Sequence, residues 1–177
     1  MNLINICDKE NNLTSEEETV TEAHKKGLWH RSVHVWVYNS EKEILLQKRS
    51  RNSFLYPSMW DAAAAGHVDS GEEPISSAVR EVREEIGMDI DKDDLQYYAM
   101  KTSSNVYNGF INNEFNYIYL LRYEGGLEKL KIQKEEVEEI GLFPLHLIEK
   151  DLNTENYVPH GDYWLKIIEE IKRRVDK

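Results

Sequence analysis

The residues of this chain best suited to chemistry are carboxylates gathered on one short predicted helix. Glu81, Glu84 and Glu85 lie close together in the sequence, and at about 100° per residue they share one side of a helix. Glu81 and Glu85 are like charges at i and i+4, so they repel each other in an isolated helix. A divalent cation that prefers hard oxygen ligands, such as Mg²⁺ or Mn²⁺, would relieve this repulsion. The pattern therefore favours a metal site over a solvated charged surface, which is the alternative for any run of glutamates.

The helix that carries these glutamates has clear ends in the sequence. Pro74 suits a first helical turn, and Gly87 suits the position just past a helix C-terminus. An apolar stripe on a neighbouring arc indicates which side packs on a core. It is formed by Ile75, Val79, Val82 and Ile86. The sequence therefore predicts a helix over residues 74–86, with the glutamates beside its buried face.

The order of residues around this helix resembles the Nudix box. The nine matching positions are, in chain order, Gly66, Glu72, Arg80, Glu81, Val82, Glu84, Glu85, Gly87 and Met88. The chain thus resembles the Nudix hydrolase superfamily, and the fold this implies is an α/β/α sandwich around a mixed β-sheet. The implied activity is that of a MutT-like pyrophosphohydrolase acting on phosphoric anhydride bonds. Its substrate would be a small molecule in which a nucleoside diphosphate is linked to another moiety.

The resemblance also implies roles for individual residues. Glu84 and Glu85 match positions that ligate the metal, and Glu81 matches one that either ligates metal or takes a proton from the attacking water. The backbone carbonyl just before the box glycine, that of Ala65, often adds a ligand. Because a diphosphate is dense in negative charge, its hydrolysis depends mainly on charge neutralisation, which bound Mg²⁺ or Mn²⁺ supplies.

Glu72 and Arg80 resemble the pair that orients the catalytic glutamate through an ion pair and hydrogen bonds. The alternative is a purely structural staple between the loop and the helix. We expect either role to matter for activity.

The resemblance extends beyond the box to the Nudix branch that includes isopentenyl-diphosphate isomerase. The stretches that carry it are GLWHRSVHVWVYNSEKEILLQKRS and PSMWDAAAAGHV. That isomerase holds a separate metal on histidines and on glutamates of a later strand. His30 and His67 match these ligands, His24 matches if one residue is skipped, and Glu114 matches the second late glutamate, whereas Asn112 replaces the first. Three histidines and a carboxylate are suitable ligands for manganese, zinc or iron.

One position separates this chain from the isomerase. The isomerase uses a cysteine immediately before the box glycine for proton transfer, but Ala65 stands there, and the only cysteine is Cys7. An alanine has no proton to donate, so the sequence favours hydrolysis. Two alternatives are an isopentenyl-diphosphate isomerase-like enzyme and a non-catalytic Nudix-fold nucleotide sensor.

Contacts to the substrate are expected from residues that follow an apolar strand. Lys48, Arg49 and Arg51 are candidates for binding phosphates, and Trp60 is a candidate for stacking on a base or ring. The alternatives are surface solvation for the basic residues and core packing for the tryptophan.

Composition limits the possible partners and the compartment. A net charge of −11 over 177 residues disfavours binding to a nucleic acid polymer or an anionic membrane. A single cysteine permits no intrachain disulfide, and no leader or membrane-spanning run is evident, so the expected location is the cytoplasm. We expect a monomer or homodimer.

The remaining elements must position these residues within an α/β fold, which we expect to be one domain over residues 1–177. Residues 1–30 would form an N-terminal extension of a strand and a helix or loop, and residues 160–177 a C-terminal helix. Residues 14–26 read as a short helix or an ordered loop. Strands are predicted at 3–7, 32–39, 43–50, 95–101, 115–123 and 140–145, and the last helix at 163–175.

Overall fold

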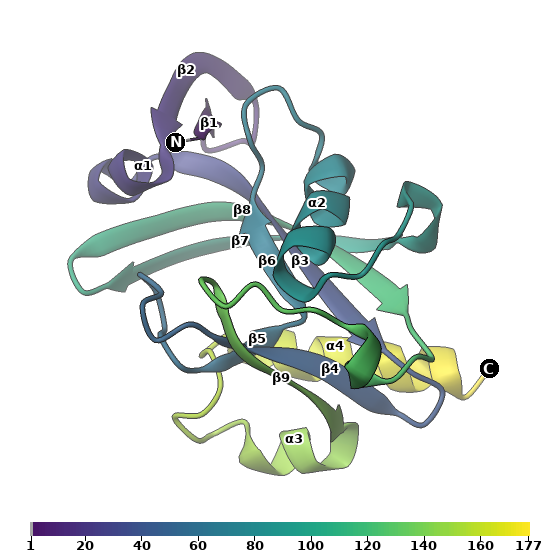
Figure 1. Cartoon of the computed structure of the whole chain (residues 1–177). Coiled ribbons are helices and arrows are strands. Elements are labelled where there is room, and N and C mark those ends of the chain that lie inside the picture. Colours follow the sequence, from purple (N-terminus) through teal and green to yellow (C-terminus); the bar gives the residue numbers. More distant parts are fainter. Residues whose placement is uncertain (1) are drawn as a thin grey trace.

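The fold consists of a branched β-sheet with helices on both faces (Figure 1). The structure is a computed structural model and describes residues 2–177. No helix in this range is long and apolar enough to cross a membrane. The elements are β1 (Leu3–Cys7), β2 (Leu13–Thr19), α1 (Val20–Lys26), β3 (Trp29–Tyr38), β4 (Glu43–Arg49), β5 (Trp60–Ala62), β6 (Ala64–His67), α2 (Pro74–Ile86), β7 (Gln96–Tyr107), β8 (Phe110–Arg122), β9 (Val137–Pro144), α3 (Leu145–Asp151) and α4 (Asp162–Val175).

Strand β3 is the centre of the sheet. It pairs in parallel with β8 along its whole length, from Trp29 opposite Asn113 to Tyr38 opposite Arg122. Along its other edge it pairs antiparallel with β1, β6 and β4 in turn. Every residue from Ser32 to Tyr38 is buried, as expected for a strand covered on both faces. The sheet therefore brings the ends of β6 and β8 beside the same stretch of β3.

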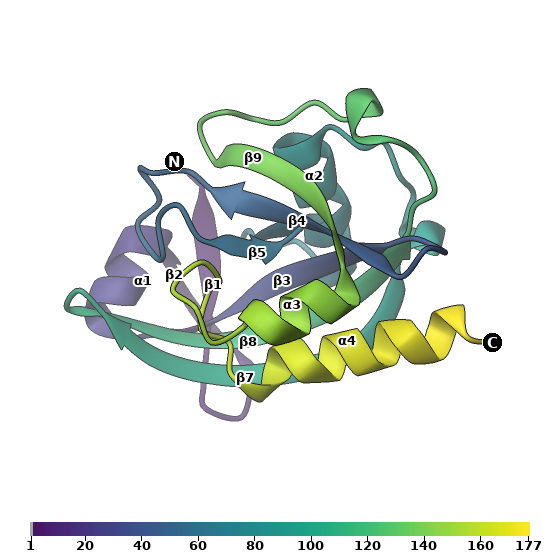
Figure 2. The same cartoon turned by 90° about the horizontal axis from the view of Figure 1, so that it is seen from below.

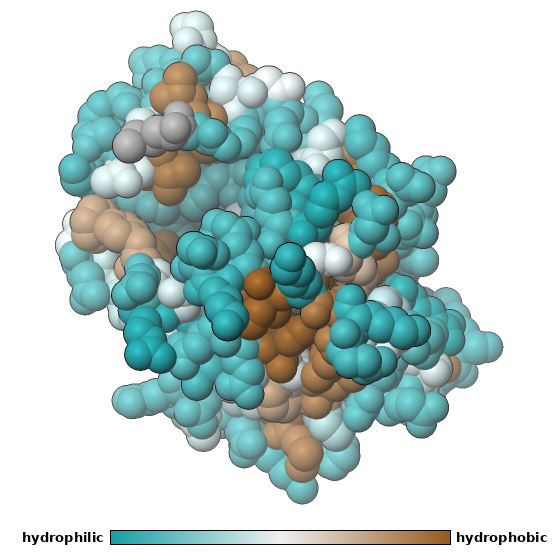
Figure 3. Space-filling view, viewed as in Figure 1, coloured by the Kyte–Doolittle hydropathy of each residue, from teal (hydrophilic) through white to brown (hydrophobic). Residues whose placement is uncertain are grey.

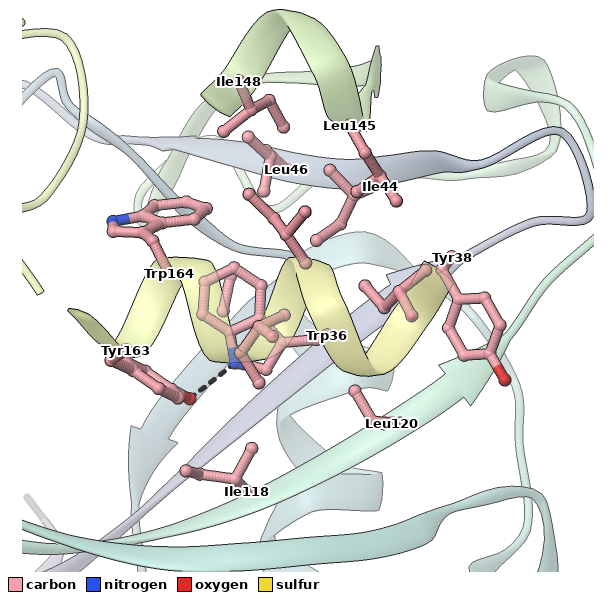
Figure 4. Close-up of a cluster of buried hydrophobic side chains, with 14 of the residues drawn as sticks. Trp36, Tyr38, Ile44, Leu46, Ile118, Leu120, Leu145, Ile148, Tyr163 and Trp164 are labelled. Carbon is pink, nitrogen blue, oxygen red and sulfur yellow. Dashed lines mark hydrogen bonds between the residues drawn. The ribbon is translucent and has the colours of Figure 1, made fainter. Parts of the chain in front are cut away.

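The helices form two layers that cover opposite faces of the sheet (Figure 2). Val33, Val35 and Val37 of β3 pack with the apolar stripe of α2 in one core. Trp36 and Tyr38, which alternate with the valines, pack with α3 and α4 in the other. Figure 4 shows this second core, in which the Trp36 indole N–H donates to the Tyr163 hydroxyl at 2.5 Å. This layering confirms the α/β/α sandwich expected from the sequence.

Helix α2 begins and ends at the predicted residues. Pro74 occupies its first turn, and Gly87 follows its last residue with a φ of 66°, a left-handed conformation that glycine adopts without strain. The Gly87 N–H donates to the carbonyls of Arg83 and Val82. Pro74 and Gly87 therefore mark the two ends of α2.

The N-terminal region differs from the prediction for residues 14–26. Residues Leu13–Thr19 form β2, which pairs antiparallel with β1, and only Val20–Lys26 are helical. The prediction was wrong for the first half because pairing with β1 provides backbone hydrogen bonds that local propensity does not reveal. Thr19 then caps α1 by accepting a hydrogen bond from the Glu22 N–H at 3.3 Å.

Several strands are longer than expected or were not expected. β7 continues to Tyr107 and β8 begins at Phe110, because a tight turn at Asn108 and Gly109, both with positive φ, joins them into a long hairpin. The small-residue run before the helix forms β5 and β6, and α3 was also not predicted.

The viewed surface is mostly hydrophilic, with apolar side chains gathered near its middle (Figure 3).

Candidate active site

A cavity of about 660 Å³ lies where α2, β6, β7, β8 and the segment before α4 meet. Its lining contains many more carboxylates than basic side chains, and the carboxylates belong to Asp61, Asp69, Glu81, Glu84, Glu85, Glu114, Glu135 and Glu136. Such a concentration of negative charge is costly unless cations offset it. The cavity therefore needs positive charge from ligands or side chains.

The glutamate cluster (Glu81, Glu84 and Glu85) forms one wall of the cavity. Glu81 and Glu85 are 7% and 4% exposed, whereas Glu84 reaches solvent. One oxygen of Glu85 accepts hydrogen bonds from the Ala65 N–H at 2.8 Å and the Gln47 amide at 2.9 Å. These bonds hold Glu85 next to β6.

Burial makes the negative charge of this wall unfavourable without a cation. It raises the pKa of Glu81 to about 7, against the lowering effect of the neighbouring Arg80. It also raises the pKa of Glu85 well above its usual range, and the nearby Glu81 charge adds to this. A divalent ion would reverse both effects by stabilising the ionised carboxylates. The two groups thus have the type, burial and spacing that suit a hard cation.

Gly66 makes room for Glu81. A Cβ atom at position 66 would overlap the Glu81 carboxylate, so any other residue there would push the glutamate away. Gly66 lies in β6, opposite Val33 of β3, so the glycine cannot easily retreat. The sheet and the helix therefore meet at a contact that only glycine permits.

Arg80 connects the glutamate cluster to the loop before α2. One of its terminal nitrogens donates to Glu81 at 2.7 Å, and the other donates to Glu72 at 3.1 Å and to the His67 carbonyl at 3.0 Å. Burial would raise the pKa of Glu72, but Arg80 and the Ser77 hydroxyl, at 2.6 Å, lower it. The structure thus brings Glu72, Arg80 and Glu81 into one network.

A histidine cluster (His24, His30, His67 and Glu114) lies beside the cavity. It draws one residue from each of α1, β3, β6 and β8, and one ligand atom of each lies within 4.8 Å of all the others. The sheet explains the convergence, since His30 is directly opposite Glu114 and His67 is opposite Ser32. The four residues matched to the isomerase metal are therefore together in space.

Several buried polar atoms in and beside this cluster make no hydrogen bond in the described structure. Both ring nitrogens of His24, Nε2 of His30, Nε2 of His67 and Oδ1 of Asn112 are buried without a hydrogen bond. Buried polar atoms normally have partners, so this convergence of orphan lone pairs fits a bound cation. His30 Nδ1 contacts the Leu28 carbonyl at 2.9 Å, which fixes its ring and directs Nε2 inward.

The electrostatics of the histidine cluster also suit a metal. Burial and the neighbouring His67 and His30 lower the pKa of His24 to about 4, so its ring is neutral at pH 7. Burial opposes ionisation of Glu114, but His30 and His67 hold its pKa well below the usual range. Neutral imidazoles and an ionised carboxylate are the forms that bind metals.

Another part of the cavity lining contains residues that the sequence did not single out. Asp61 lies 2.7 Å from the His160 ring and 3.5 Å from Arg49, and His34 lies 3.1 Å from the Tyr163 hydroxyl. Since 99 positions separate Asp61 from His160, no local pattern could have paired them.

The proposed substrate contacts are divided by the structure. Arg49 lines the cavity, and Lys48 does not, because successive residues of a strand point to opposite faces. Lys48 and the exposed Arg51 instead lie 3.8 Å and 3.9 Å from Glu138. Trp60 packs on Phe143 at the edge of a core, with ring centroids 4.7 Å apart. Among these four candidates, the structure brings only Arg49 to the cavity.

Comparison with known proteins adds independent information. The chain is 36% identical over 163 residues to Nudix hydrolase 3 of Arabidopsis thaliana, covering 86% of this chain but only 21% of that protein. It is 28% identical to a Nudix hydrolase of Clostridium acetobutylicum, covering 93% and 94% of the two chains. It is also 32% identical to the isopentenyl-diphosphate Delta-isomerase of Ruegeria pomeroyi, covering 82% and 78%.

Solved structures share the fold. A crystal structure from Deinococcus radiodurans matches with a TM-score of 0.68 at 21% identity, over 97% of this chain and 98% of that one. A MutT protein from Methanosarcina mazei matches with a TM-score of 0.60 at 22% identity, over 84% and 96%. The family model of the NUDIX domain matches residues 28–162, a range that contains the whole box and most of the cavity. This chain belongs to the Nudix hydrolase superfamily.

Proposed function

We propose that this protein is a Mg²⁺- or Mn²⁺-dependent hydrolase that cleaves a diphosphate linkage in a nucleoside diphosphate linked to another moiety. The observation that carries the proposal is the pair of buried carboxylates, Glu81 and Glu85, one helical turn apart on a wall of the cavity. Their burial without a compensating cation is unfavourable, so the arrangement is explained best by a function that supplies one.

The residues would divide the work as follows. Glu84, Glu85 and the Ala65 carbonyl would hold Mg²⁺ or Mn²⁺, which when bound neutralises charge on phosphoryl oxygens. Glu81 would either join them or accept a proton from the attacking water as a general base. Arg80 and Glu72 would hold Glu81 in the orientation it needs.

We propose a second ion at the histidine cluster. The orphan nitrogens of His24, His30 and His67 and the ionised Glu114 support this assignment. Imidazole ligands favour manganese, zinc or iron over magnesium. The two clusters would then hold metals of different preference in one cavity.

The histidine cluster and the isomerase relatives raise the alternative of alkene isomerisation. Ala65 argues against it, because the position offers no thiol and the buried Cys7 lies in β1. Asp61, His160 and Arg49 also line the cavity, and these polar groups suit a polar substrate better than a hydrocarbon chain.

The proposal is tested with a panel of diphosphate compounds, assayed with Mg²⁺ and Mn²⁺ and with products identified by mass. The panel includes nucleotide sugars, diadenosine tetraphosphate and isopentenyl diphosphate. We expect a nucleoside monophosphate or phosphate product from at least one nucleotide compound, and no dimethylallyl diphosphate. Tight nucleotide binding without any product would instead identify a sensor.

A variant ties the activity to the site. Glu81→Gln should lower kcat by about a hundredfold or more, which corresponds to roughly 3 kcal/mol, while leaving the melting temperature within a few degrees. Glu169→Gln, on the exposed face of α4, is the matched control and should retain wild-type turnover. Near wild-type turnover in Glu81→Gln would refute the assignment.

A further inference from the structure

Lys101 is a basic side chain of the cavity that sequence reasoning did not single out. It lies on β7, opposite Asn116 of β8, and lines the same cavity as the glutamate cluster. Its ammonium group lies over the Tyr163 ring, 4.6 Å from the centroid. Within residues 2–177 this ammonium makes no hydrogen bond or ion pair. Its three N–H groups are therefore available to a ligand.

The other two cations of the cavity are already bound. Arg80 donates to Glu72, Glu81 and the His67 carbonyl. Arg49 donates to the Leu55 carbonyl at 3.0 Å and faces Asp61. Of the lysine and arginine side chains that line the described cavity, Lys101 alone has no acceptor. Burial lowers the pKa of Lys101, which indicates that the protein removes part of its hydration.

The surroundings of Lys101 hold it in place. The Tyr163 hydroxyl accepts from the Trp36 indole at 2.5 Å and lies 3.1 Å from His34 Nδ1 (Figure 4). The ring beneath the ammonium is therefore fixed, and a cation over an aromatic face is attracted to it. Asp61, a carboxylate whose charge reaches Lys101, is already satisfied by His160 and Arg49. Glu114, whose charge acts on Lys101 more strongly than that of Asp61, accepts hydrogen bonds from Asn112 and Asn116, and neither carboxylate is within ion-pair distance of the ammonium.

We infer that Lys101 binds an oxyanion of the substrate. The oxyanion belongs either to the diphosphate itself or to a second phosphate or carboxylate on the attached moiety. The identity of the ligand as a substrate rests on the proposed function, whereas the contact requires no turnover. Without such a partner a partly desolvated ammonium is costly, and a hydrocarbon in its place would increase that cost. The Lys101 ammonium therefore favours an anionic group over an isoprenoid chain in its part of the cavity.

Binding of inorganic phosphate tests the contact directly. Isothermal titration of the Mg²⁺-loaded protein should show phosphate binding that is roughly tenfold or more weaker in Lys101→Met, as expected for loss of a hydrogen bond to a charged group. Lys101→Arg should retain more affinity than Lys101→Met, because it keeps the charge. Lys150→Met, an exposed lysine on α3 that does not line the cavity, is the matched control and should bind like the wild type. Melting temperatures check that each variant is folded.

Two outcomes of the titration would overturn the inference. One is equal phosphate binding by the wild type and Lys101→Met, and the other is no binding by the wild type. Neither depends on hydrolysis, so failure of the proposed function, seen as no product from any compound, is separate from failure of the Lys101 contact.

Matched substrates identify the source of the oxyanion. UDP-glucose and UDP-glucuronate differ by one carboxylate, and NADH and NADPH differ by one phosphate. A uniform loss of kcat/KM across these pairs in Lys101→Met places the contact on the diphosphate. A loss confined to UDP-glucuronate places it on the attached moiety, and a loss confined to NADPH places it on the nucleoside. Values within twofold of the wild type for all four compounds would contradict a substrate contact.

Discussion

The glutamate cluster and the histidine cluster lie in one molecule but are built in opposite ways. The glutamates come from two turns of a single helix and are joined to Arg80 and Ala65 by hydrogen bonds. The histidine cluster draws on α1, β3, β6 and β8, and both ring nitrogens of His24 and Nε2 of His30 and His67 make no hydrogen bond within residues 2–177. Local spacing defines the first, whereas strand register defines the second. The two also differ in ligand chemistry, since hard carboxylates suit Mg²⁺ and imidazoles suit transition metals.

The largest effect should come from filling the space that Gly66 leaves. Gly66→Ala would place a methyl group against the Glu81 carboxylate, which must then leave Arg80. We expect kcat to fall by about a hundredfold or more, equivalent to roughly 3 kcal/mol. The same variant should keep transition-metal binding at the histidine cluster within a few fold. Equal loss at both clusters, measured by kinetics and Co²⁺ titration, would show that they are not separate.

The reciprocal change should affect the other cluster. His30→Ala removes the proposed ligand that lies opposite Glu114. We expect the affinity for Zn²⁺ or Co²⁺ to fall by about a hundredfold, because loss of a direct ligand should cost at least as much as loss of a residue that only orients a ligand. Mg²⁺ binding at the glutamate cluster should be unchanged. His146→Ala, exposed on α3, is the control. Unchanged Zn²⁺ binding in His30→Ala, measured by competition with a chelating dye, would remove the second metal from the proposal.

The stabilisation that Mg²⁺ provides at the glutamate cluster should depend on pH. In the metal-free protein the pKa of Glu81 is raised to about 7. Protonated Glu81 therefore contributes fully to the stability of the folded state at pH values below the ordinary pKa of a glutamate. That contribution is lost as pH rises through about 7. Mg²⁺ should therefore stabilise the protein little near pH 5.5 and by about 1–3 kcal/mol near pH 8.5. Melting curves with Mg²⁺ or EDTA at both values measure this, and stabilisation that falls with pH would contradict it.

The smallest effect should come from weakening the link between Glu72 and Arg80. Arg80→Lys keeps the charge but loses the fork that contacts Glu72 and Glu81 together. We expect kcat to fall by about tenfold, or roughly 1.4 kcal/mol, with KM little changed. A structural staple alone would lower the melting temperature without changing kcat, so measuring both separates the two roles.

The sequence predicted much of the site because its chemistry is local. The box spacing placed Glu81, Glu84 and Glu85 on one helix, and Pro74 and Gly87 marked the ends of that helix. Most strands with apolar alternation were also found where expected. These features depend on residues that are near one another in the chain, which is the information that periodicity and capping rules use.

The parts that the sequence did not predict depend on distant pairing. The Asp61–His160 contact and the position of Lys101 in the cavity lining arise from how β5, β7 and the segment before α4 are packed. Likewise, the sequence did not predict that β2 is a strand, because this strand depends on its pairing with β1. Lys48 and Arg49 read alike in the sequence, but the strand sends them to opposite faces.

The parallel pairing of β3 with β8 has a consequence for how the chain folds. Ser32 and Asn116, which lie two residue pairs along the ladder from His30 and Glu114, are 84 positions apart. Closing a loop of this length is slow compared with forming a helix or a hairpin. The helix that carries the glutamates can form early, whereas the histidine cluster can assemble only once this long-range ladder is in place. The absorption of Co²⁺ at the histidine cluster would therefore report when β3 and β8 pair during folding, because the cluster is complete only after these strands have joined.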